Sequence, residues 1–432
     1  MTDAAWIDGA ITAARPRAVS ALLRYFRDLD VAEEAFQEAC LRALKTWPVK
    51  GPPRDPTAWL VLVGRNAALD GARRRARDRP LPDEAAISES EDAEVSLVER
   101  LDEAHYRDDI LRLLFVCCHP DLPDTQQIAL ALRIVSGLTV EEIARAFLVG
   151  QAAMEQRITR AKARVAKAGA PFETPNAVDR AERLAAVAAM IYLVFNAGYS
   201  APAEASRERL CDEAIRLGRL LLRLFESEPE IMGLLALMLL QHSRRGARID
   251  TGGEVVLLED QDRTLWDARP IAEGLALIDK AMRHRRPGPY QIQAAIAALH
   301  GRATRADDTD WAQIDALYAS LERVQPSPVV TLNRAVAVAK TRGPGAALDL
   351  IAPLEDRLGG YFHYYGAKGA LLLQLERPGE AREAFNRAIA LATDPVQAAF
   401  IRGRLDRLER DAGAAPPEKS ARPVGTAAPP TS

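Results

Sequence analysis

Residues 60–79, LVLVGRNAALDGARRRARDR, join an apolar pattern directly to a cluster of arginines. Leu60, Leu62 and Val63 belong to an apolar side at helical spacing, so the stretch predicts an α-helix whose far end carries the charge. Between residues 65 and 79 six arginines stand against two aspartates, a local charge of +4 in a chain of net charge −3. This cluster is either a solvated helix end, where cations favour the helix dipole, or a surface that binds nucleic acid.

The rest of the chain also has a helical pattern. Residues 6–47 place apolar side chains three and four positions apart, and the KGPPR segment at 50–54 cannot continue a helix. The next helix begins near Thr57. Although 48% of the residues are hydrophobic, strand-like runs of Val, Ile, Thr and aromatic residues are scarce. We therefore expect an all-α fold, and a chain of 432 residues is long enough for more than one domain.

Charge divides the first 170 residues into three segments. Residues 1–80 carry 14 basic and 10 acidic side chains, residues 81–105 carry 1 and 9, and residues 106–170 carry 9 and 7. We expect domains at 1–80 and 106–170, joined by an acidic linker at 81–105. The linker is either a solvated spacer or a mimic of DNA charge.

The segment from residue 124 to residue 168 predicts a helix-turn-helix. Asp124 with Gln127 and Thr139 with Glu142 form two candidate capping boxes, and a basic helix follows the turn at Gly150. The second helix of such a motif enters the major groove of DNA. Its candidate DNA-binding residues are Gln156, Arg157, Arg160, Lys162 and Arg164. The alternative is an ordinary helical hairpin with a solvated basic face.

Three motifs in this order resemble bacterial RNA polymerase sigma factors of the extracytoplasmic-function class. The stretch DVAEEAFQEACLRAL at 30–44 resembles the helix that binds the polymerase, and AWLVLVGRNAALDGARRRARDR at 58–79 resembles the helix that reads and melts the −10 element. The helix-turn-helix resembles region 4, which reads the −35 element. The resemblance covers residues 1 to about 170 and implies a helical region 2 bundle and a region 4 helix-turn-helix.

The resemblance implies partners and site residues. Residues expected to bind core RNA polymerase are Glu33, Glu34, Gln37 and Glu38. Residues expected at the −10 element of promoter DNA are Trp59, Asn66, Asp70, Arg73, Arg74 and Arg75. Trp59 has an alternative role as a core residue. The recognition helix has Ala153 and Glu155 where the family usually has a hydroxyl and a base, so it departs from the family pattern.

Residues 171–410 predict a helical repeat domain. Four similar sequence segments, here called frames, begin at Gly274, Ile314, Ala347 and Ala381. Their starts are spaced by 33 to 40 residues, close to the period of about 34 of tetratricopeptide repeats. Stacked helical hairpins of this kind offer a surface that binds a peptide or a protein, and the domain would regulate the chain through it. The tail at 411–432 is rich in Pro, Ala and Ser and is expected to be disordered.

This extension resembles that of one large subgroup of the class, whose hallmark segment appears as GGEVVLLEDQDRTLWD at 252–267. Its EVVLL run is the most strand-like of the extension. A polar cluster follows the run and is a candidate regulatory segment, made of Glu259, Asp260, Gln261, Asp262, Arg263 and Trp266. It is either a ligand or partner pocket, or a packed cap on the repeats.

No catalytic constellation, phosphate-binding loop or metal-ligand helix is found, so we expect no enzyme activity, no cofactor and no metal. The four cysteines fit buried thiols in a reducing cytoplasm. With neither a secretion signal nor an apolar run of about 18 residues, we expect no membrane span. Two functions compete with a sigma factor: a conventional helix-turn-helix transcription regulator with a repeat-type sensor domain, and an all-α scaffold whose basic face is incidental.

Overall fold

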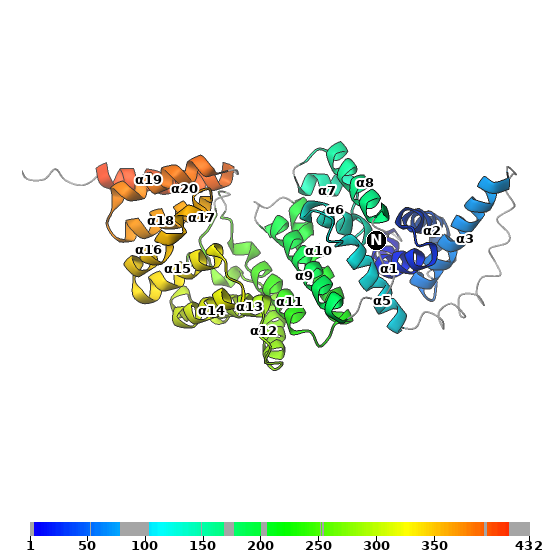
Figure 1. Ribbon diagram of the computed structural model, residues 1–432, viewed down its shortest axis with the longest axis horizontal. Helices are drawn as coiled ribbons and strands as arrows, with labels where there is room; N and C mark the ends of the chain where they lie inside the picture. Colours follow the sequence, from blue (N-terminus) through cyan, green and yellow to red (C-terminus); the bar gives the residue numbers. More distant parts are fainter. Residues whose placement is uncertain are drawn as a thin grey trace, which may run out of the picture. The chain divides into compact units, whose positions relative to one another are not determined.

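The fold is helical throughout the described part of the chain (Figure 1). The computed structural model describes residues 4–51, 53–77, 103–147, 149–167, 177–199, 205–250, 252, 255–392 and 395–413. Within these ranges there is no β-strand, and one isolated bridge pairs Ile249 with Val255. The expected all-α fold is therefore confirmed. Most of the expected acidic linker, residues 81–102, and the tail beyond residue 413 lie outside the described residues.

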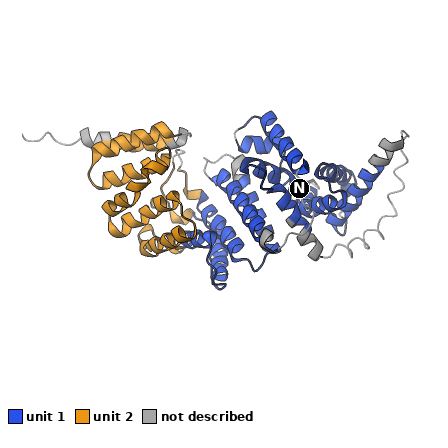
Figure 2. Cartoon of the chain, in the orientation of Figure 1, with its two compact units in different colours: residues 1–245, 266–298 blue, residues 246–265, 299–432 orange. Residues whose placement is uncertain are grey.

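The chain divides into two compact units, which Figure 2 shows in different colours. Residues 1–245 and 266–298 form the first unit, and residues 246–265 and 299–432 form the second. The first unit contains the helices α1 (Ala4–Phe26), α2 (Leu29–Lys50), α3 (Pro56–Arg77), α5 (Glu103–Cys117), α6 (Asp124–Ile134), α7 (Val140–Ala146), α8 (Gln151–Lys167), α9 (Ala177–Tyr199), α10 (Ala205–Leu224), α11 (Pro229–His242), α12 (Ala268–Met282) and most of α13 (Pro289–Arg302). The second contains α14 (Trp311–Val324), α15 (Pro328–Arg342), α16 (Pro344–Ile351), α17 (Glu355–Leu358), α18 (Phe362–Gln374), α19 (Pro378–Leu391) and α20 (Pro395–Gly413).

Helices α1, α2 and α3 pack against one another as a bundle. Asp28 caps α2 by accepting hydrogen bonds from the backbone of Asp30 and Val31, and α2 ends at Gly51, whose φ is +81°. Gly64 allows α3 to approach α2 closely, since a Cβ there would lie 2.6 Å from the carbonyl oxygen of Ala35. The bundle presents the outer surfaces of α2 and α3 in a fixed geometry.

The helix-turn-helix is present, with one error in its expected start. The capping box of Thr139 and Glu142 begins α7 as expected. At α6, however, Pro123 is the N-cap residue and no side chain caps the helix. The amide of Gln127 turns back instead and donates to the carbonyl oxygens of His119 and Leu122. The turn after α6 ends at Gly137, which adopts a φ of +78°.

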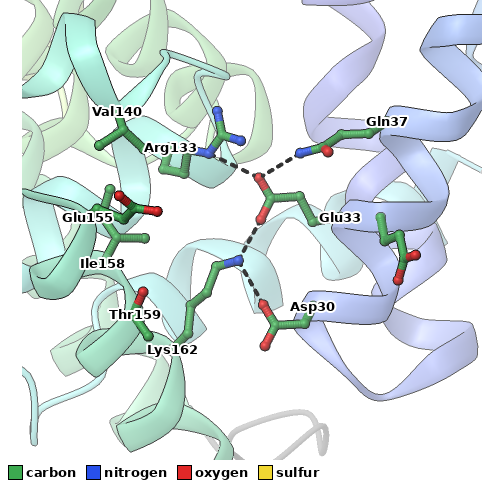
Figure 3. Close-up of a pocket in the computed structure, with 10 residues that line it drawn as sticks. Asp30, Glu33, Gln37, Arg133, Val140, Glu155, Ile158, Thr159 and Lys162 are labelled. Carbon is green, nitrogen blue, oxygen red and sulfur yellow. Dashed lines mark hydrogen bonds and ion pairs between the residues drawn. The ribbon is translucent and has the colours of Figure 1, made fainter. Parts of the chain in front are cut away.

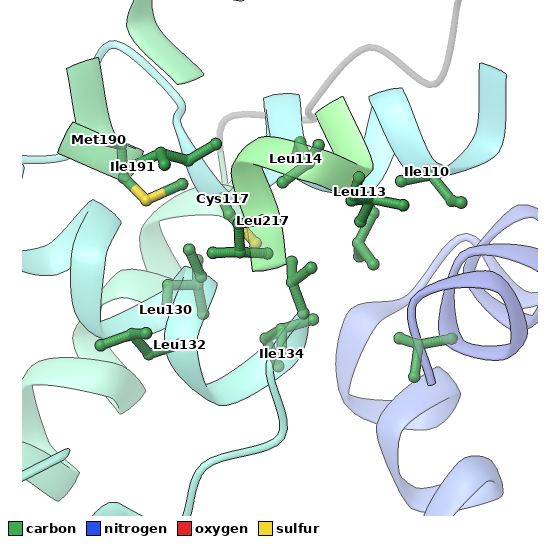
Figure 4. Close-up of a cluster of buried hydrophobic side chains, with 14 of the residues drawn as sticks. Ile110, Leu113, Leu114, Cys117, Leu130, Leu132, Ile134, Met190, Ile191 and Leu217 are labelled. Carbon is green, nitrogen blue, oxygen red and sulfur yellow. The ribbon is translucent and has the colours of Figure 1, made fainter. Parts of the chain in front are cut away.

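Helices α9 and α10, from the expected extension, complete the core of the helix-turn-helix. Helix α9 packs on α5 and α6, and α10 packs on α9 and α7. Figure 4 shows the buried side chains that meet there, including Leu113, Leu130, Ile191 and Leu217. These helices therefore share one continuous hydrophobic core.

Part of α9 departs from the expectation that no apolar run is long enough to span a membrane. Ala181–Tyr199 passes that test by length and composition, with a hydropathy of 1.3. The core helix of a soluble protein passes the same test. Val187, Ile191 and Phe195 on this helix are fully buried in the first unit, and 33% of the apolar window is buried in all.

The four expected frames fall on helices that pack against a neighbouring helix. Gly274, Ile314, Ala347 and Ala381 lie in α12, α14, α16 and α19 and are all buried. The packing partners are α11 for α12, α15 for both α14 and α16, and α18 for α19. Each of the four frames therefore lies on a helix that packs on a neighbouring helix, and the tetratricopeptide character of the extension stays a prediction.

Candidate functional site

The outward face of α2 carries most of the residues expected to bind polymerase. Glu34 and Gln37 are exposed, and Glu38 is half-buried and accepts a hydrogen bond from Nε of Arg42 at 3.1 Å. The same face continues with two exposed leucines, Leu41 and Leu44, that the sequence analysis did not assign to it. Leu44 follows the three-and-four spacing of the apolar residues in 6–47, but it is exposed. Acidic, polar and apolar groups thus form one surface.

Glu33 differs from its neighbours because it points into the protein, with 4% of its surface exposed. Its Oε2 accepts a hydrogen bond from Nζ of Lys162 on α8 at 2.7 Å, and its Oε1 lies 3.2 Å from Nε of Arg133 on α6. Arg15 of α1 lies 3.6 Å away. A buried carboxylate needs such partners to offset its lost hydration. The structure therefore brings one expected polymerase-binding residue against the helix expected to bind DNA.

Helix α8 turns Met154, Ile158, Ala161 and Val165 into the core. Of its candidate DNA-binding residues, Gln156, Arg160 and Arg164 are exposed and Arg157 is half-buried, while Arg164 also donates to the carbonyl oxygen of Asp121 at 3.2 Å. Lys162 lies on the side of α8 that faces α2, where its Nζ donates to carboxylate oxygens of Asp30 and Glu33, each at 2.7 Å. Burial alone would lower the pKa of Lys162, but the hydrogen bonds to both carboxylates outweigh it and the pKa is raised. Lys162 is therefore a charged member of an ion-pair cluster.

A polar pocket of about 280 Å³ separates α2 from α6 and α8 (Figure 3). Its walls come from both expected sites: Asp30, Glu33, Glu34, Gln37, Arg133, Val140, Glu155, Ile158, Thr159 and Lys162. Four of these residues are acidic and two are basic, so the pocket is negative apart from the two cations that hold Glu33. Such a pocket repels a phosphate group rather than binding one.

The expected −10 residues lie on α3 in three kinds of surroundings. Trp59 is half-buried, and its ring lies 5.3 Å from that of Trp47 in an edge-on contact, so it contributes to the core. Asn66 and Asp70 are exposed. Arg73, Arg74 and Arg75 lie in the last turns of the helix, and their side chains are outside the described residues.

The members of the candidate regulatory segment make contacts in different places. Arg263 points inward and donates to the carbonyl oxygens of His300 and Ala303 at 2.5 and 2.7 Å, and Gln261 is buried and bonds to the carbonyl of Val256. Glu259 pairs with Lys340 of α15 at 2.6 Å. These contacts fit a packed cap on the second unit. Asp262 bonds to the adjacent Thr264.

Trp266 belongs to the first unit and is buried beside Arg244, whose guanidinium lies 5.8 Å from its ring. Of the EVVLL run the structure describes residues 255–258, where Val255 forms a single bridge with Ile249 and no strand is present.

The cysteines do not form a metal centre in the described part of the chain. Cys117, Cys118 and Cys211 are buried and Cys40 is partly buried, all with free thiols. Burial raises the pKa of the Cys40 thiol to about 11 and that of Cys118 to about 12, so both are protonated at neutral pH. Among the described residues no group of three or more His, Cys, Asp or Glu side chains could hold a metal ion.

Comparison with known families accounts for three parts of the chain. Residues 10–78 match sigma-70 region 2, and residues 112–165 match sigma-70 region 4. Residues 183–282 match a family of unknown function, DUF6596. A protein of Rhizobium meliloti (strain 1021), described as uncharacterized, is 70% identical over 411 residues, which are 94% of this chain and 97% of that protein.

These matches define a sigma-70-type sigma factor, which directs transcription initiation, binds core RNA polymerase and promoter DNA, and is not an enzyme. The chain belongs to the same family as the R. meliloti protein and carries the DUF6596 sequence behind its two sigma regions. A conventional regulator or a scaffold has no use for region 2, so the two competing functions are set aside. Helices α1–α3 are hereafter region 2, α5–α8 region 4, and the helices from α9 onward the extension.

Proposed function

We propose that this sigma factor belongs to the extracytoplasmic-function class and is controlled by its extension. The observation that carries the class is the spacing of the two matches, because only residues 79–111 separate region 2 from region 4. A chain with so short a connection has no room for a further promoter-binding domain between them. We place this sigma factor in the cytoplasm, where transcription takes place.

The three binding roles fall on exposed residues of three different helices. Glu34, Gln37 and Glu38 on α2 are accessible to the polymerase, and the arginines at the end of α3 follow the exposed Asn66 and Asp70 toward the −10 element. On α8, Gln156, Arg157, Arg160 and Arg164 are oriented away from the core for the −35 element. Arginines there bind phosphates and base edges, which gives steep salt dependence.

Control through the extension is supported by its contacts with region 4. Arg183 of α9 lies over the ring of Phe115, 5.6 Å from its centre, and Arg209 of α10 pairs with Glu142 of α7 at 3.1 Å. Any ligand or protein that moves α9 or α10 therefore acts on the DNA-binding motif directly. The later paired helices, which we propose to be tetratricopeptide-like, would receive that protein or peptide.

Runoff transcription with purified core polymerase and a library of genomic fragments tests this function. The full-length protein is expected to give transcripts that share an upstream motif. Glu34→Lys should weaken polymerase binding about tenfold, since it reverses a charge on the exposed α2 face. Arg157→Ala should weaken −35 recognition and leave polymerase binding unchanged.

Two controls match these changes in charge. Glu226→Lys reverses an exposed carboxylate and Arg283→Ala removes an exposed arginine, and both residues lie outside the two sigma matches. Both should transcribe like the wild type. Equal loss of polymerase binding and −35 recognition in Arg157→Ala would contradict the role of α8, and absence of any promoter-specific transcript would contradict the proposal as a whole.

A further inference from the structure

Residues 246–265 lie between α11 and α12 in the sequence and belong to the second unit, although both of these helices belong to the first (Figure 2). In its described part, the segment contains the short 3-10 helices Arg245–Ala247 and Arg263–Leu265, and neither an α-helix nor a strand. Irregular segments of this length are uncommon within a compact domain and usually carry a function. The segment is thus an insertion that the second unit holds in addition to its own paired helices.

Arg263 anchors one end of this segment. Its Nη1 donates to the carbonyl oxygens of His300 and Ala303 at 2.5 and 2.7 Å, and its Nη2 donates to Oγ1 of Thr309 at 3.3 Å. Thr309 is buried. Hydrogen bonds from a charged donor are strong, and the buried acceptors would be left without this partner if Arg263 moved away. This end of the segment therefore stays in place.

The acidic tip of the segment, Glu259 and Asp260, is held more weakly. Both residues are exposed, and Oε2 of Glu259 pairs with Nζ of Lys340 on α15 at 2.6 Å. The side chains of this pair are 47% and 42% exposed, and an ion pair so exposed contributes little to stability. The carboxylate of Asp260 makes no ion pair in the part of the chain that the structure describes. The tip can therefore leave α15 while the other end remains anchored.

The surface near the acidic tip carries positive charge that the tip only partly offsets. Burial, together with the neighbouring Arg407, lowers the pKa of Arg404 on α20, and the two carboxylates of the tip act in the opposite direction without restoring it. Among the described residues Arg404 makes no hydrogen bond or ion pair. Val336 lies one turn before Lys340 on α15 and is 50% exposed. The surface thus offers two cations and an apolar side chain to an acidic chain segment.

We propose that Lys340, Arg404 and Val336 form a binding site for an acidic segment of a partner protein, and that the acidic tip occupies this site when no partner is bound. The inference rests on the proposed function, in which the extension receives a protein or peptide, and it names the chemistry of that partner. The chain itself gives the pattern of such a segment, since two leucines at 257–258 precede the two carboxylates. A partner has to displace the tip, which competes at a high effective concentration because its anchored end keeps it near the site.

Binding of a fluorescent peptide to the full-length protein tests the site without polymerase or DNA. The probe has the sequence of residues 255–261, VVLLEDQ. The double variant Glu259→Gln, Asp260→Asn has a tip without charge, so it should bind the probe about tenfold more tightly than the wild type. Asp349→Asn, Glu383→Gln removes two exposed carboxylates elsewhere in the second unit and should bind like the wild type.

The cations are tested in the variant whose tip has lost its charge. Adding Lys340→Gln or Arg404→Gln should abolish the gain in affinity, whereas adding Arg323→Gln, which removes an exposed arginine from α14, should leave it intact. Equal affinity of the probe for the wild type and the variant with the uncharged tip would overturn the proposal, and so would a gain that survives both cation changes. Failure of the sigma function would appear separately, as absent runoff transcription with the peptide affinities unchanged.

Discussion

Region 4 is held on two sides by different kinds of contact. Toward the extension, Leu130 and Ile134 of α6 share an apolar core with Met190 and Ile191 of α9 (Figure 4). Toward α2, the contact is made by Lys162 and Arg133 with carboxylates. Salt screens buried ion pairs less than exposed ones, and the burial of apolar area does not depend on ion pairs. The difference teaches that α6 joins the extension through apolar side chains and α2 through carboxylates, while α1 of region 2 also packs on α5 within the same apolar core.

Disrupting the apolar contact between α6 and α9 should lower the free energy of unfolding the most. Ile191→Ala removes a fully buried side chain from the core of α9 and should destabilise the first unit by about 2–5 kcal/mol, with little dependence on salt. Denaturant unfolding at two salt concentrations measures this. Leu193→Ala, a partly exposed position on the same helix, should cost far less. Equal losses in the two variants would show that the α9 contact does not stabilise region 4.

A change at the turn after α6 tests the contact of region 2 with the backbone of region 4. Gly137 has a φ of +78°, and a Cβ there would lie 2.8 Å from Cδ of Arg15. Gly137→Ala should therefore cost about 1–2 kcal/mol and displace the Arg15 cap, as measured by unfolding. Gly150→Ala is the matched control, since its Cβ would meet nothing within 4 Å. A Gly137→Ala protein as stable as the wild type would contradict the strain described here.

The capping box of α7 should contribute less. Thr139→Ala removes the side chain that accepts from the backbone of Glu142 and should cost about 1 kcal/mol, read from thermal or denaturant unfolding. Thr159→Ala, exposed on α8, should be close to neutral.

The same box predicts a pH dependence. Hydrogen bonds from Thr139, the backbone one first, lower the pKa of Glu142 below its usual 4.5. Its stabilising contribution is therefore present above pH 4.5 and is lost as the pH falls through the lower folded value. The stability gap between the wild type and Glu142→Gln should close on acidification, and a gap that widened would contradict this assignment.

The ionic contact should show the smallest effect on stability and the opposite pH dependence. The pKa of Lys162 is raised above its usual 10.5, so its contribution is complete below pH 10.5 and is lost as the pH rises through the folded value. Lys162→Gln should lower stability modestly at neutral pH, and the gap to the wild type should narrow in strong alkali. A gap that persists there would mean that the charge of Lys162 is not what stabilises the contact.

Local patterns predicted much of the fold, and the errors have local physical causes. The capping box at Thr139 could be predicted because its two residues are three positions apart. The capping box predicted at Asp124 is wrong, because Pro123 is the N-cap residue and the side chain of Gln127 donates to the carbonyl oxygen of Leu122. Leu44 continues an apolar pattern but lies on the outer face of α2.

The sequence predicted the polymerase-binding residues of α2 and the DNA-binding residues of α8 separately. It did not predict that Glu33 and Lys162 are in contact. The surroundings of Glu33 depend on Arg133 and Lys162, which lie 100 and 129 positions further along the chain. No periodicity or spacing within α2 encodes such a contact. The expected roles of Glu34, Gln37 and the exposed residues of α8 remain predictions that fit their exposure.

Helix α9 also has a consequence for the synthesis of the protein. Because chains fold from the N-terminus as they leave the ribosome, region 4 emerges before Ile191 and Phe195 are available to cover it. A nascent or prematurely terminated chain that stops before α9 exposes the apolar surface of α5 and α6, and is therefore a substrate for chaperones and proteases. The core of region 4 is therefore completed by helices that are synthesised after it.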